Sequence, residues 1–292
     1  MNLIQTKSFK LAIYSKGDES SSRLALVLPG KLDTKDYPHM HSHVEYLSKK
    51  GFYAVSFDPP GTWESPGDIK LYTMTNYAKT VNELIEYFGN KPTFVMGHSF
   101  GGGITLLVGV NNPNVISFAS IMSRGSYMPE HHGEDYPDQE WKARGYRIST
   151  RDLPKNLNQK KEFKLPYSFL EDRINYDMSG GLSKSEKPKL LILGKYDELV
   201  EPESVRKVYE MAAAPKELFE LDFGHDYRKS KVMIDKVNNV IGDFLDKYEA
   251  PLANAIGIFS SRFVGAKSSE AKNSSHLSTN SQTSFSAKED KV

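Results

Sequence analysis

The sequence predicts a doubly wound α/β protein with a mostly parallel sheet and one inserted lid. Short apolar runs alternate with longer amphipathic segments, the pattern of strands joined by crossover helices. One long polar segment interrupts this alternation, and a Ser- and Asn-rich stretch follows it at the end of the chain. A length of 292 residues is enough for one large domain of this kind.

The expected strands differ in their polarity. Residues 9–13 alternate between polar and apolar, as an edge or antiparallel strand does. Continuous apolar runs are typical of buried parallel strands, and they occur at residues 24–28, 52–57, 92–96, 115–121, 190–193 and 218–221.

Helices are expected between these strands. Residues 39–50 form a helix that ends at Gly51, and residues 75–88 carry an apolar stripe on one face. The remaining helical segments are residues 102–108, which are rich in small residues, 202–213, and the closing helix 229–248.

Two segments interrupt the alternation of strands and helices, and they define the expected domain organisation. Residues 1–123 and 189–250 form the core, and residues 124–188 form an insertion between two core strands. This insertion is polar and rich in aromatic residues, and we expect it to act as a lid over the carboxyl edge of the sheet. Residues 251–292 form a C-terminal tail that we expect to be disordered from about residue 265.

Composition excludes several classes of function. The net charge of +1 gives no indication of binding to nucleic acid or to an anionic membrane. The absence of cysteine excludes a disulfide framework, a thiolate zinc site and a cysteine nucleophile. No apolar run approaches the roughly 18 residues of a spanning helix, and the N-terminus has no signal-like apolar region. We therefore expect a soluble, cytoplasmic protein with no integral membrane segment.

The most informative motif is Gly-His-Ser-Phe-Gly at residues 97–101, which lies between an expected strand and an expected helix. A serine at such a strand-to-helix turn presents its hydroxyl above the edge of the sheet. The flanking Gly97 and Gly101 are required because a Cβ there would collide with a neighbouring strand or helix. Ser99 is therefore the candidate nucleophile.

A serine hydroxyl needs a positioned base, and two candidates follow later strands. Asp197 and His225 each come just after an expected strand, so they belong at the same carboxyl edge as Ser99. Glu198 and Glu201 are rival carboxylates for the orienting acid. A turn-capping role for the acid and a surface position for the histidine also remain open.

These motifs, with Asp-Pro-Pro-Gly at residues 58–61, make the chain resemble the α/β-hydrolase family over about residues 8–248. The insertion is similar to the cap segments of esterase and serine-aminopeptidase-like members. The resemblance implies that Ser99 attacks a carbonyl, that His225 takes and returns its proton, and that Asp197 orients the imidazole.

The resemblance also implies an oxyanion hole. One donor is the backbone N–H of Phe100, the residue after the nucleophile. The second belongs to the loop after strand 24–28, where this chain has Pro-Gly-Lys-Leu in place of the family's frequent His-Gly. Alignment to that pattern assigns Lys31, with Leu32 as the alternative.

The sequence thus predicts a serine esterase with a catalytic triad. It would cleave an ester, thioester or amide of a small-molecule acyl substrate through an acyl-enzyme on Ser99, without a cofactor or metal. A carboxylesterase is favoured over a peptidase or acyltransferase that uses the same triad. A non-catalytic member that binds a small molecule is a further alternative.

Two groups of residues each have two possible roles. The residues His39, His41 and His43 suggest a metal site, but a solvated helix start is the favoured interpretation; the pair at residues 131–132 is expected in an exposed loop. Aromatic residues of the insertion either line an acyl pocket or form the lid's own small core. The pocket candidates among them are Tyr127, Trp141 and Phe169.

Overall fold

The computed structural model describes residues 2–127 and 139–248 of the chain. The chain divides into two compact units, Met1–Phe244 and Leu245–Val292, and the second is described only over residues 245–248. The predicted tail at residues 251–292, with its expected disorder from about residue 265, lies outside the described residues. The first unit contains the insertion together with the predicted core segments up to Phe244, so the separation of a lid from the core stays a prediction.

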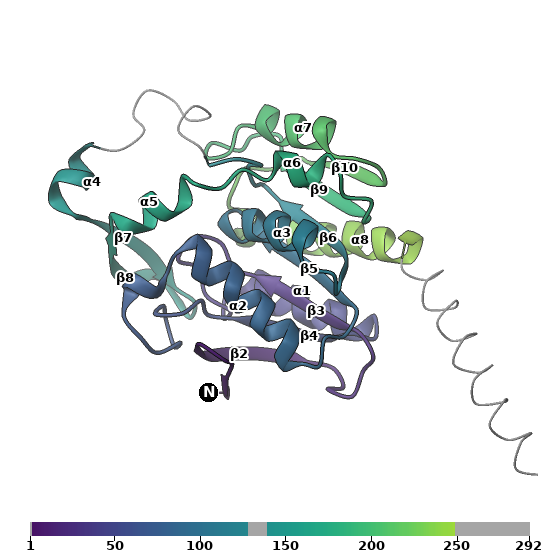
Figure 1. The fold of residues 1–292 in the computed structure, drawn as a ribbon, viewed down its shortest axis with the longest axis horizontal. Helices are drawn as coiled ribbons and strands as arrows, with labels where there is room; N and C mark the ends of the chain where they lie inside the picture. The colour runs from purple at the N-terminus through teal and green to yellow at the C-terminus, as the bar shows by residue number, and fades with distance from the viewer. Residues whose placement is uncertain (1, 128–138, 249–292) are drawn as a thin grey trace, which may run out of the picture. The chain divides into compact units, whose positions relative to one another are not determined.

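The predicted doubly wound, mostly parallel sheet is confirmed (Figure 1). Within the described residues it has eight strands in the order β1-β2-β4-β3-β5-β6-β9-β10. β2 pairs antiparallel with both β1 and β4, and the other neighbours are parallel. The strands are β1 (Asn2–Gln5), β2 (Lys10–Lys16), β3 (Leu24–Leu28), β4 (Tyr53–Phe57), β5 (Thr93–His98), β6 (Val115–Ile121), β9 (Lys189–Gly194) and β10 (Lys216–Leu221).

The central strands are as buried as their apolar runs indicate. Every residue of β3, β4, β5 and β9 is buried, because helices cover both faces of a parallel sheet. The strand expected at residues 9–13 is β2. The short strand β1 pairs with it on its outer side and was not anticipated from the sequence.

The helices lie close to the expected segments. They are α1 (Pro38–Lys49), α2 (Met74–Tyr87), α3 (Phe100–Asn111), α7 (Pro202–Met211) and α8 (Lys231–Tyr248). Figure 1 shows α2 and α3 in front of the sheet and α1 behind it. The side chain of Thr73 caps α2 by accepting a hydrogen bond from the N–H of Asn76. Within the described residues, no helix combines the length and apolar composition needed to cross a bilayer.

Residues 124–188, called the insert below, connect β6 to β9, which are neighbours in the sheet. An antiparallel hairpin of β7 (Tyr146–Leu153) and β8 (Asn156–Pro166) forms its largest described part. The short helices α4 (Gln139–Arg144), α5 (Ser168–Arg173) and α6 (Ser179–Leu182) flank the hairpin. The sequence did not predict this hairpin because β8 buries only Phe163 and Leu165, so its alternation is weak.

Candidate active site

Ser99 lies at the sharp turn between β5 and α3. Its backbone adopts φ 52° and ψ −118°, a conformation that side chains rarely adopt, and its N–H donates to the carbonyl of Ile121 at 2.8 Å. The predicted need for glycine on both sides is confirmed. A Cβ on Gly97 would lie 2.3 Å from the carbonyl oxygen of Gly101, and one on Gly101 would lie 2.4 Å from that of Leu28. The turn therefore holds the hydroxyl in place above the sheet.

The three residues proposed for the triad lie in one hydrogen-bonded row. Nε2 of His225 is 2.9 Å from Oγ of Ser99, and Nδ1 of His225 is 2.8 Å from Oδ2 of Asp197. Asp197 and His225 are buried, with exposed fractions of 8% and 5%. The row forms because β5, β9 and β10 run parallel and end at the same edge of the sheet.

Hydrogen bonds hold both carboxylate oxygens of Asp197 in place. Its Oδ1 accepts hydrogen bonds from the backbone N–H groups of Leu199 and Val200, each at 2.8 Å, which leaves Oδ2 for the imidazole. The rival Glu198 has a different contact: its Oε2 accepts from the backbone N–H of His225 at 3.3 Å, not from the ring. The geometry therefore favours Asp197 as the orienting acid.

The residue before the serine also supports this row. His98 is buried and its Nε2 lies 3.1 Å from the backbone carbonyl of His225. Burial lowers the pKa of His98 well below its ordinary value, so the ring is neutral and its Nε2–H donates to that carbonyl. Sequence reasoning treated this position only as the variable residue of the motif.

The two candidate residues for the oxyanion hole after β3 have different surroundings. The N–H of Leu32 donates to the Tyr72 hydroxyl at 2.9 Å, so it is already engaged. Lys31 lines the same cavity as Ser99 and Phe100. The N–H of Phe100 is at the first residue of α3, where a helix provides no acceptor of its own. Between the two alternatives, this geometry favours Lys31.

Arg151 of β7 binds the carbonyl group of Lys31, the residue that carries this donor. Its Nε and Nη2 donate to the carbonyl oxygen of Lys31 at 2.8 and 2.5 Å, and its Nε lies 3.1 Å from Oδ1 of Asp33. The side chain comes from the insert and reaches the loop of the core. The sequence alone assigned no role to Arg151, since the two positions lie 120 residues apart.

The expectation of a solvated helix start for residues 39–43 is wrong. His39 and His43 have exposed fractions of 0%, because α1 packs this face against the rest of the fold. His43 bonds to Asn238 at 2.6 Å and to Tyr227 at 2.8 Å, and burial lowers its pKa to about 4. Only His41 of the three remains half-exposed, and it stacks on a tyrosine ring. The expected exposed pair at residues 131–132 lies outside the described residues.

Two groups of side chains in the described residues have ligand atoms close enough together to hold a metal ion. The first joins Asp33, His39 and His98, and the second joins Asp36, Asp58 and Glu64. In the second group the ammonium of Lys35 lies 2.7, 3.5 and 2.7 Å from the three carboxylates. In the first group, Asp33 is paired with a guanidinium. A protein cation thus already neutralises each group.

A cavity of about 610 Å³ opens beside Ser99, and only one of the three predicted pocket aromatics lines it. Tyr127 faces this cavity. Phe169 is fully buried and stacks on Tyr72 with ring centroids 5.3 Å apart, and Trp141 donates through its indole N–H to Leu165 at 3.2 Å. Neither of these two side chains is among the described residues that line the cavity beside Ser99, and the pocket role predicted for them stays a prediction.

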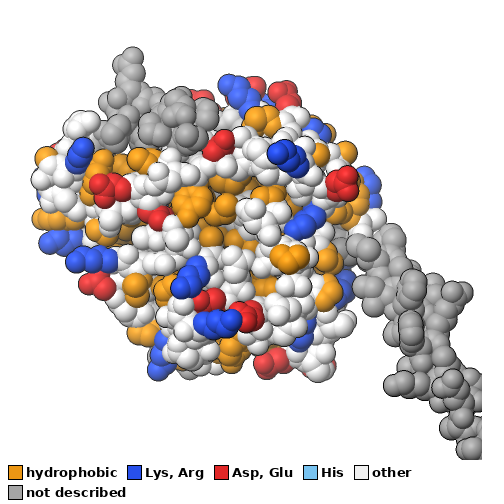
Figure 2. Space-filling model, in the orientation of Figure 1, with side chains coloured by type: hydrophobic (Ala, Val, Ile, Leu, Met, Phe, Trp, Pro, Cys, Tyr) orange, Lys and Arg blue, Asp and Glu red, His pale blue; other side chains and the backbone are white. Residues whose placement is uncertain are grey.

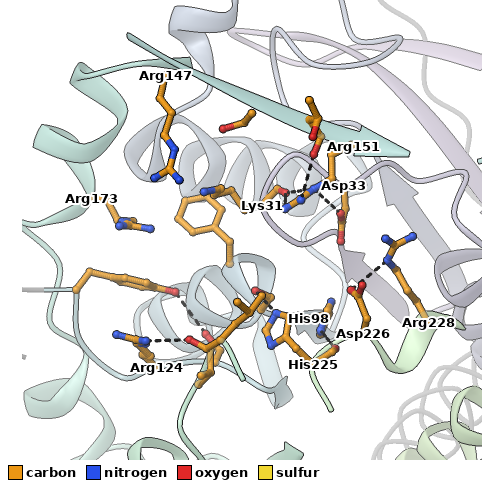
Figure 3. Close-up of a pocket in the computed structure, with 18 of the residues that line it drawn as sticks. Lys31, Asp33, His98, Arg124, Arg147, Arg151, Arg173, His225, Asp226 and Arg228 are labelled. Atoms are coloured by element: carbon orange, nitrogen blue, oxygen red, sulfur yellow. Dashed lines mark hydrogen bonds and ion pairs between the residues drawn. The ribbon is translucent and has the colours of Figure 1, made fainter. Parts of the chain in front are cut away.

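Sequence reasoning missed the cationic lining of this cavity. Six Lys and Arg side chains from five separate segments meet there, and no run of basic residues in the sequence signals it. Figure 3 shows several of them, among them Arg147 and Arg173, directed into the cavity.

Comparison with known proteins finds similarity to α/β hydrolases. The family model for the alpha/beta hydrolase fold matches residues 26–162. The mouse palmitoyl-protein thioesterase ABHD10, described as mitochondrial, is 24% identical over 226 residues, 76% of this chain and 75% of the relative. The zebrafish lysophosphatidylserine lipase ABHD12 is 33% identical over 92 residues, 31% of this chain and 24% of the relative.

Solved structures share the fold. Mouse alpha/beta hydrolase domain-containing protein 10 superimposes with a TM-score of 0.66 at 20% identity and covers 84% of this chain and 98% of its own. Est1E from Butyrivibrio proteoclasticus, solved with ferulic acid bound, gives a TM-score of 0.68 at 17% identity and covers 86% and 100%.

Proposed function

The chain belongs to the α/β-hydrolase superfamily, and on this premise we propose that it is a serine hydrolase that cleaves a carboxylic ester or thioester through an acyl-enzyme on Ser99. The observation that carries the proposal is the row of hydrogen bonds from Ser99 through His225 to Asp197, with lengths of 2.9 and 2.8 Å. Superfamily membership and a relative named as a thioesterase support hydrolysis of an acyl bond.

The chemistry follows from this row. Nε2 of His225 accepts the Ser99 proton as Oγ attacks the carbonyl carbon, and the new oxyanion receives hydrogen bonds from the N–H groups of Phe100 and Lys31. The tetrahedral intermediate then expels the alcohol or thiol, which takes the proton from His225. Water attacks the acyl-enzyme by the same route, releases the carboxylic acid and restores Ser99. Asp197 holds the tautomer in which Nε2 can accept a proton.

The size of the cavity supports a small-molecule substrate. Its volume of about 610 Å³ lies within the range of small-molecule sites, which is roughly 300–1,000 Å³. The part of the substrate that does not react would occupy this space, between the sheet edge and the insert. In this proposal the insert is the lid that contacts that part.

Covalent labelling tests the nucleophile. A fluorophosphonate probe, followed by peptide mapping, should modify Ser99 in the wild type and should give no labelled site in Ser99→Ala. Ser123→Ala is the matched control, because Ser123 is a second, buried serine that lines the same cavity. Labelling at Ser123, or equal labelling of Ser99→Ala, would contradict the proposal.

The type of bond that the protein cleaves is tested with an ester, a thioester and an anilide of the same acid. The 4-nitrophenyl ester, the 4-nitrophenyl thioester and the 4-nitroanilide of butyric acid differ only in the leaving atom. We expect the ester and thioester to be hydrolysed, with the anilide slower than both. Faster hydrolysis of the anilide would assign the protein to the amidases instead.

A cytoplasmic location belongs to this proposal as well. The mouse relative is described as mitochondrial. Fractionation of cells that express the full chain would decide between the two, and recovery with the mitochondrial fraction would overturn the cytoplasmic location.

A further inference from the structure

The loop after β3, which carries the proposed oxyanion donor Lys31, has a strained backbone. Leu32 adopts φ 57°, in the left-handed region that favours glycine, and the N–H of Asp33 donates to the carbonyl of Gly30 at 3.1 Å to close the turn. A conformation of this kind costs free energy and persists only where surrounding contacts prevent its relaxation. The contacts of this loop therefore determine where the N–H of Lys31 lies.

Two side chains of the core hold Leu32 itself. The hydroxyl of Tyr72 accepts a hydrogen bond from the N–H of Leu32 at 2.9 Å, and the indole N–H of Trp63 donates to the carbonyl of Leu32 at 2.8 Å. The core thus engages both backbone groups of the strained residue. The carbonyl of the preceding residue, Lys31, is bound from the insert instead.

Arg151 of the insert makes contacts on both sides of Leu32. Its Nε and Nη2 donate to the carbonyl oxygen of Lys31 at 2.8 and 2.5 Å, and its Nε lies 3.1 Å from Oδ1 of Asp33 (Figure 3). The guanidinium presents its donors in a rigid fork, so these bonds restrain orientation as well as distance. Relaxation of Leu32 would rotate the carbonyl of Lys31 away from this fork. Arg151 therefore opposes the change that the strain favours.

The next residue of β7 fastens the hairpin to the core. The carbonyl of Asp152 accepts a hydrogen bond from the hydroxyl of Tyr37 at 2.8 Å, and its carboxylate forms a two-pronged pair with Arg228, with distances of 2.9 and 2.8 Å. Arg228 lies three residues after His225. Two successive residues of the insert thus bind the two loops that carry the proposed oxyanion donor and the proposed base.

A purely structural role for Arg151 would be an ion pair that fastens the insert to the core. Its side chain is 31% exposed, and partly exposed ion pairs contribute little to stability. Two of its donors bind the main-chain carbonyl of Lys31, and the N–H of Lys31 shifts with its Cα when that carbonyl rotates. Loss of this side chain should therefore displace the donor more than it destabilises the fold.

We propose that Arg151 is a positioning residue for the oxyanion hole, because it holds the loop after β3 so that the N–H of Lys31 meets the oxyanion formed at Ser99. The insert thereby completes the catalytic apparatus in addition to covering it. This inference rests on the proposed function, since it assigns a residue to the same reaction. It places the contribution of Arg151 in the transition state and not in the binding of substrate.

Kinetics on 4-nitrophenyl acetate, which has a small acyl group, test this assignment. Arg151→Gln should lower kcat by about 10–100-fold and change KM by less than about threefold, because a misplaced donor weakens the transition state alone. The melting temperature should fall by only a few degrees. Arg151→Lys should restore part of kcat, since an ammonium can donate to the carbonyl but lacks the fork.

Arg144→Gln is the matched control. Arg144 belongs to α4 of the insert, forms an exposed ion pair with Glu140 at 3.1 Å and is not among the described residues that line the cavity beside Ser99. On the face in Figure 2, basic and acidic side chains are interspersed, and the loss of one exposed ion pair among them should have little effect. Both kcat and KM should therefore stay within about twofold of the wild type.

A pair of ketones separates positioning from substrate binding. Hexyl trifluoromethyl ketone adds to a serine hydroxyl as a hemiketal whose oxyanion lies in the oxyanion hole, whereas hexyl methyl ketone occupies the site without a stable adduct. Arg151→Gln should weaken inhibition by the first ketone by about the same factor as kcat, and inhibition by the second by less than about twofold. Equal weakening of both ketones, or an unchanged kcat, would overturn the inference, whereas hydrolysis of esters by the wild type would still support the proposed function.

Fluorine NMR separates the two proposals if the wild type hydrolyses no ester. The hemiketal gives a fluorine signal distinct from that of the free ketone, and it should be absent in Ser99→Ala. If the wild type forms the adduct, the proposed function fails, and a smaller adduct fraction in Arg151→Gln would support the positioning role. An equal fraction in that variant, or no adduct with the wild type, would overturn the positioning role as well.

Discussion

Ser99, Asp197 and His225 follow strands of the buried sheet, whereas Arg147, Arg151 and Arg173 belong to a hairpin and a short helix of the insert. The first three are held by hydrogen bonds to one another and to backbone groups that the sheet fixes in place. The arginines come from elements that are partly exposed.

The difference between these two regions indicates a division of roles. The sheet edge supplies a relay for proton transfer that depends on positions fixed to a fraction of an ångström. The insert supplies charge and shape, which tolerate more variation in position. Substitutions at the sheet edge should therefore change the rate for every substrate, and substitutions in the insert, apart from Arg151, should change the preference among substrates.

Ser99→Ala should have the largest effect. Loss of the nucleophile removes the covalent route, so kcat should fall by about 10⁴-fold or more for every ester, with a small residual rate from the oxyanion hole and binding. Steady-state kinetics on 4-nitrophenyl esters of several chain lengths, with the melting temperature as a check of folding, measure this. A loss confined to some of these esters would break the proposed division of roles.

Asp197→Asn should have the second largest effect, a loss of about 10³–10⁴-fold in kcat. The N–H groups of Leu199 and Val200 require an acceptor, so the amide oxygen of the asparagine would face them and its NH₂ would face His225. The imidazole would then carry its proton on Nε2 and could not accept one from Ser99.

Glu198→Gln is the control for the preceding substitution, because this side chain accepts a hydrogen bond from the backbone N–H of His225 and not from the imidazole ring. A loss of less than about fivefold is expected for it. If Glu198→Gln were the more damaging of the two, the orienting carboxylate would be misassigned by one residue.

Phe169→Ala tests the packing of the insert. The ring is fully buried against Tyr72 and close to Phe100, so its removal should cost about 3–5 kcal/mol of unfolding free energy. Thermal denaturation should show a lower melting temperature, while the ranking of esters by chain length should persist in the folded variant. Tyr127→Leu, at the cavity wall, should change that ranking. If Phe169→Ala changed the ranking and Tyr127→Leu did not, Phe169 would be assigned to the substrate pocket.

The sequence by itself predicted the fold and the row of residues at the sheet edge. Apolar runs located β3 and β6 to the residue, and the glycines around Ser99 signalled a turn that a Cβ would obstruct. These features are local, because strand polarity and turn chemistry depend on neighbouring residues. Asp197 and His225 could be located because parallel strands all end at one edge.

Only the tertiary structure decided the burial of His39 and His43 and the charge of the cavity. Polar side chains at the start of a helix predict exposure, and contacts with Tyr227 and Asn238, nearly 200 residues away, reverse that expectation. The basic side chains of the lining come from separate segments between Lys31 and Arg228. Their convergence depends on how the insert packs on the core, and a sequence with balanced overall charge carries no local signal of it.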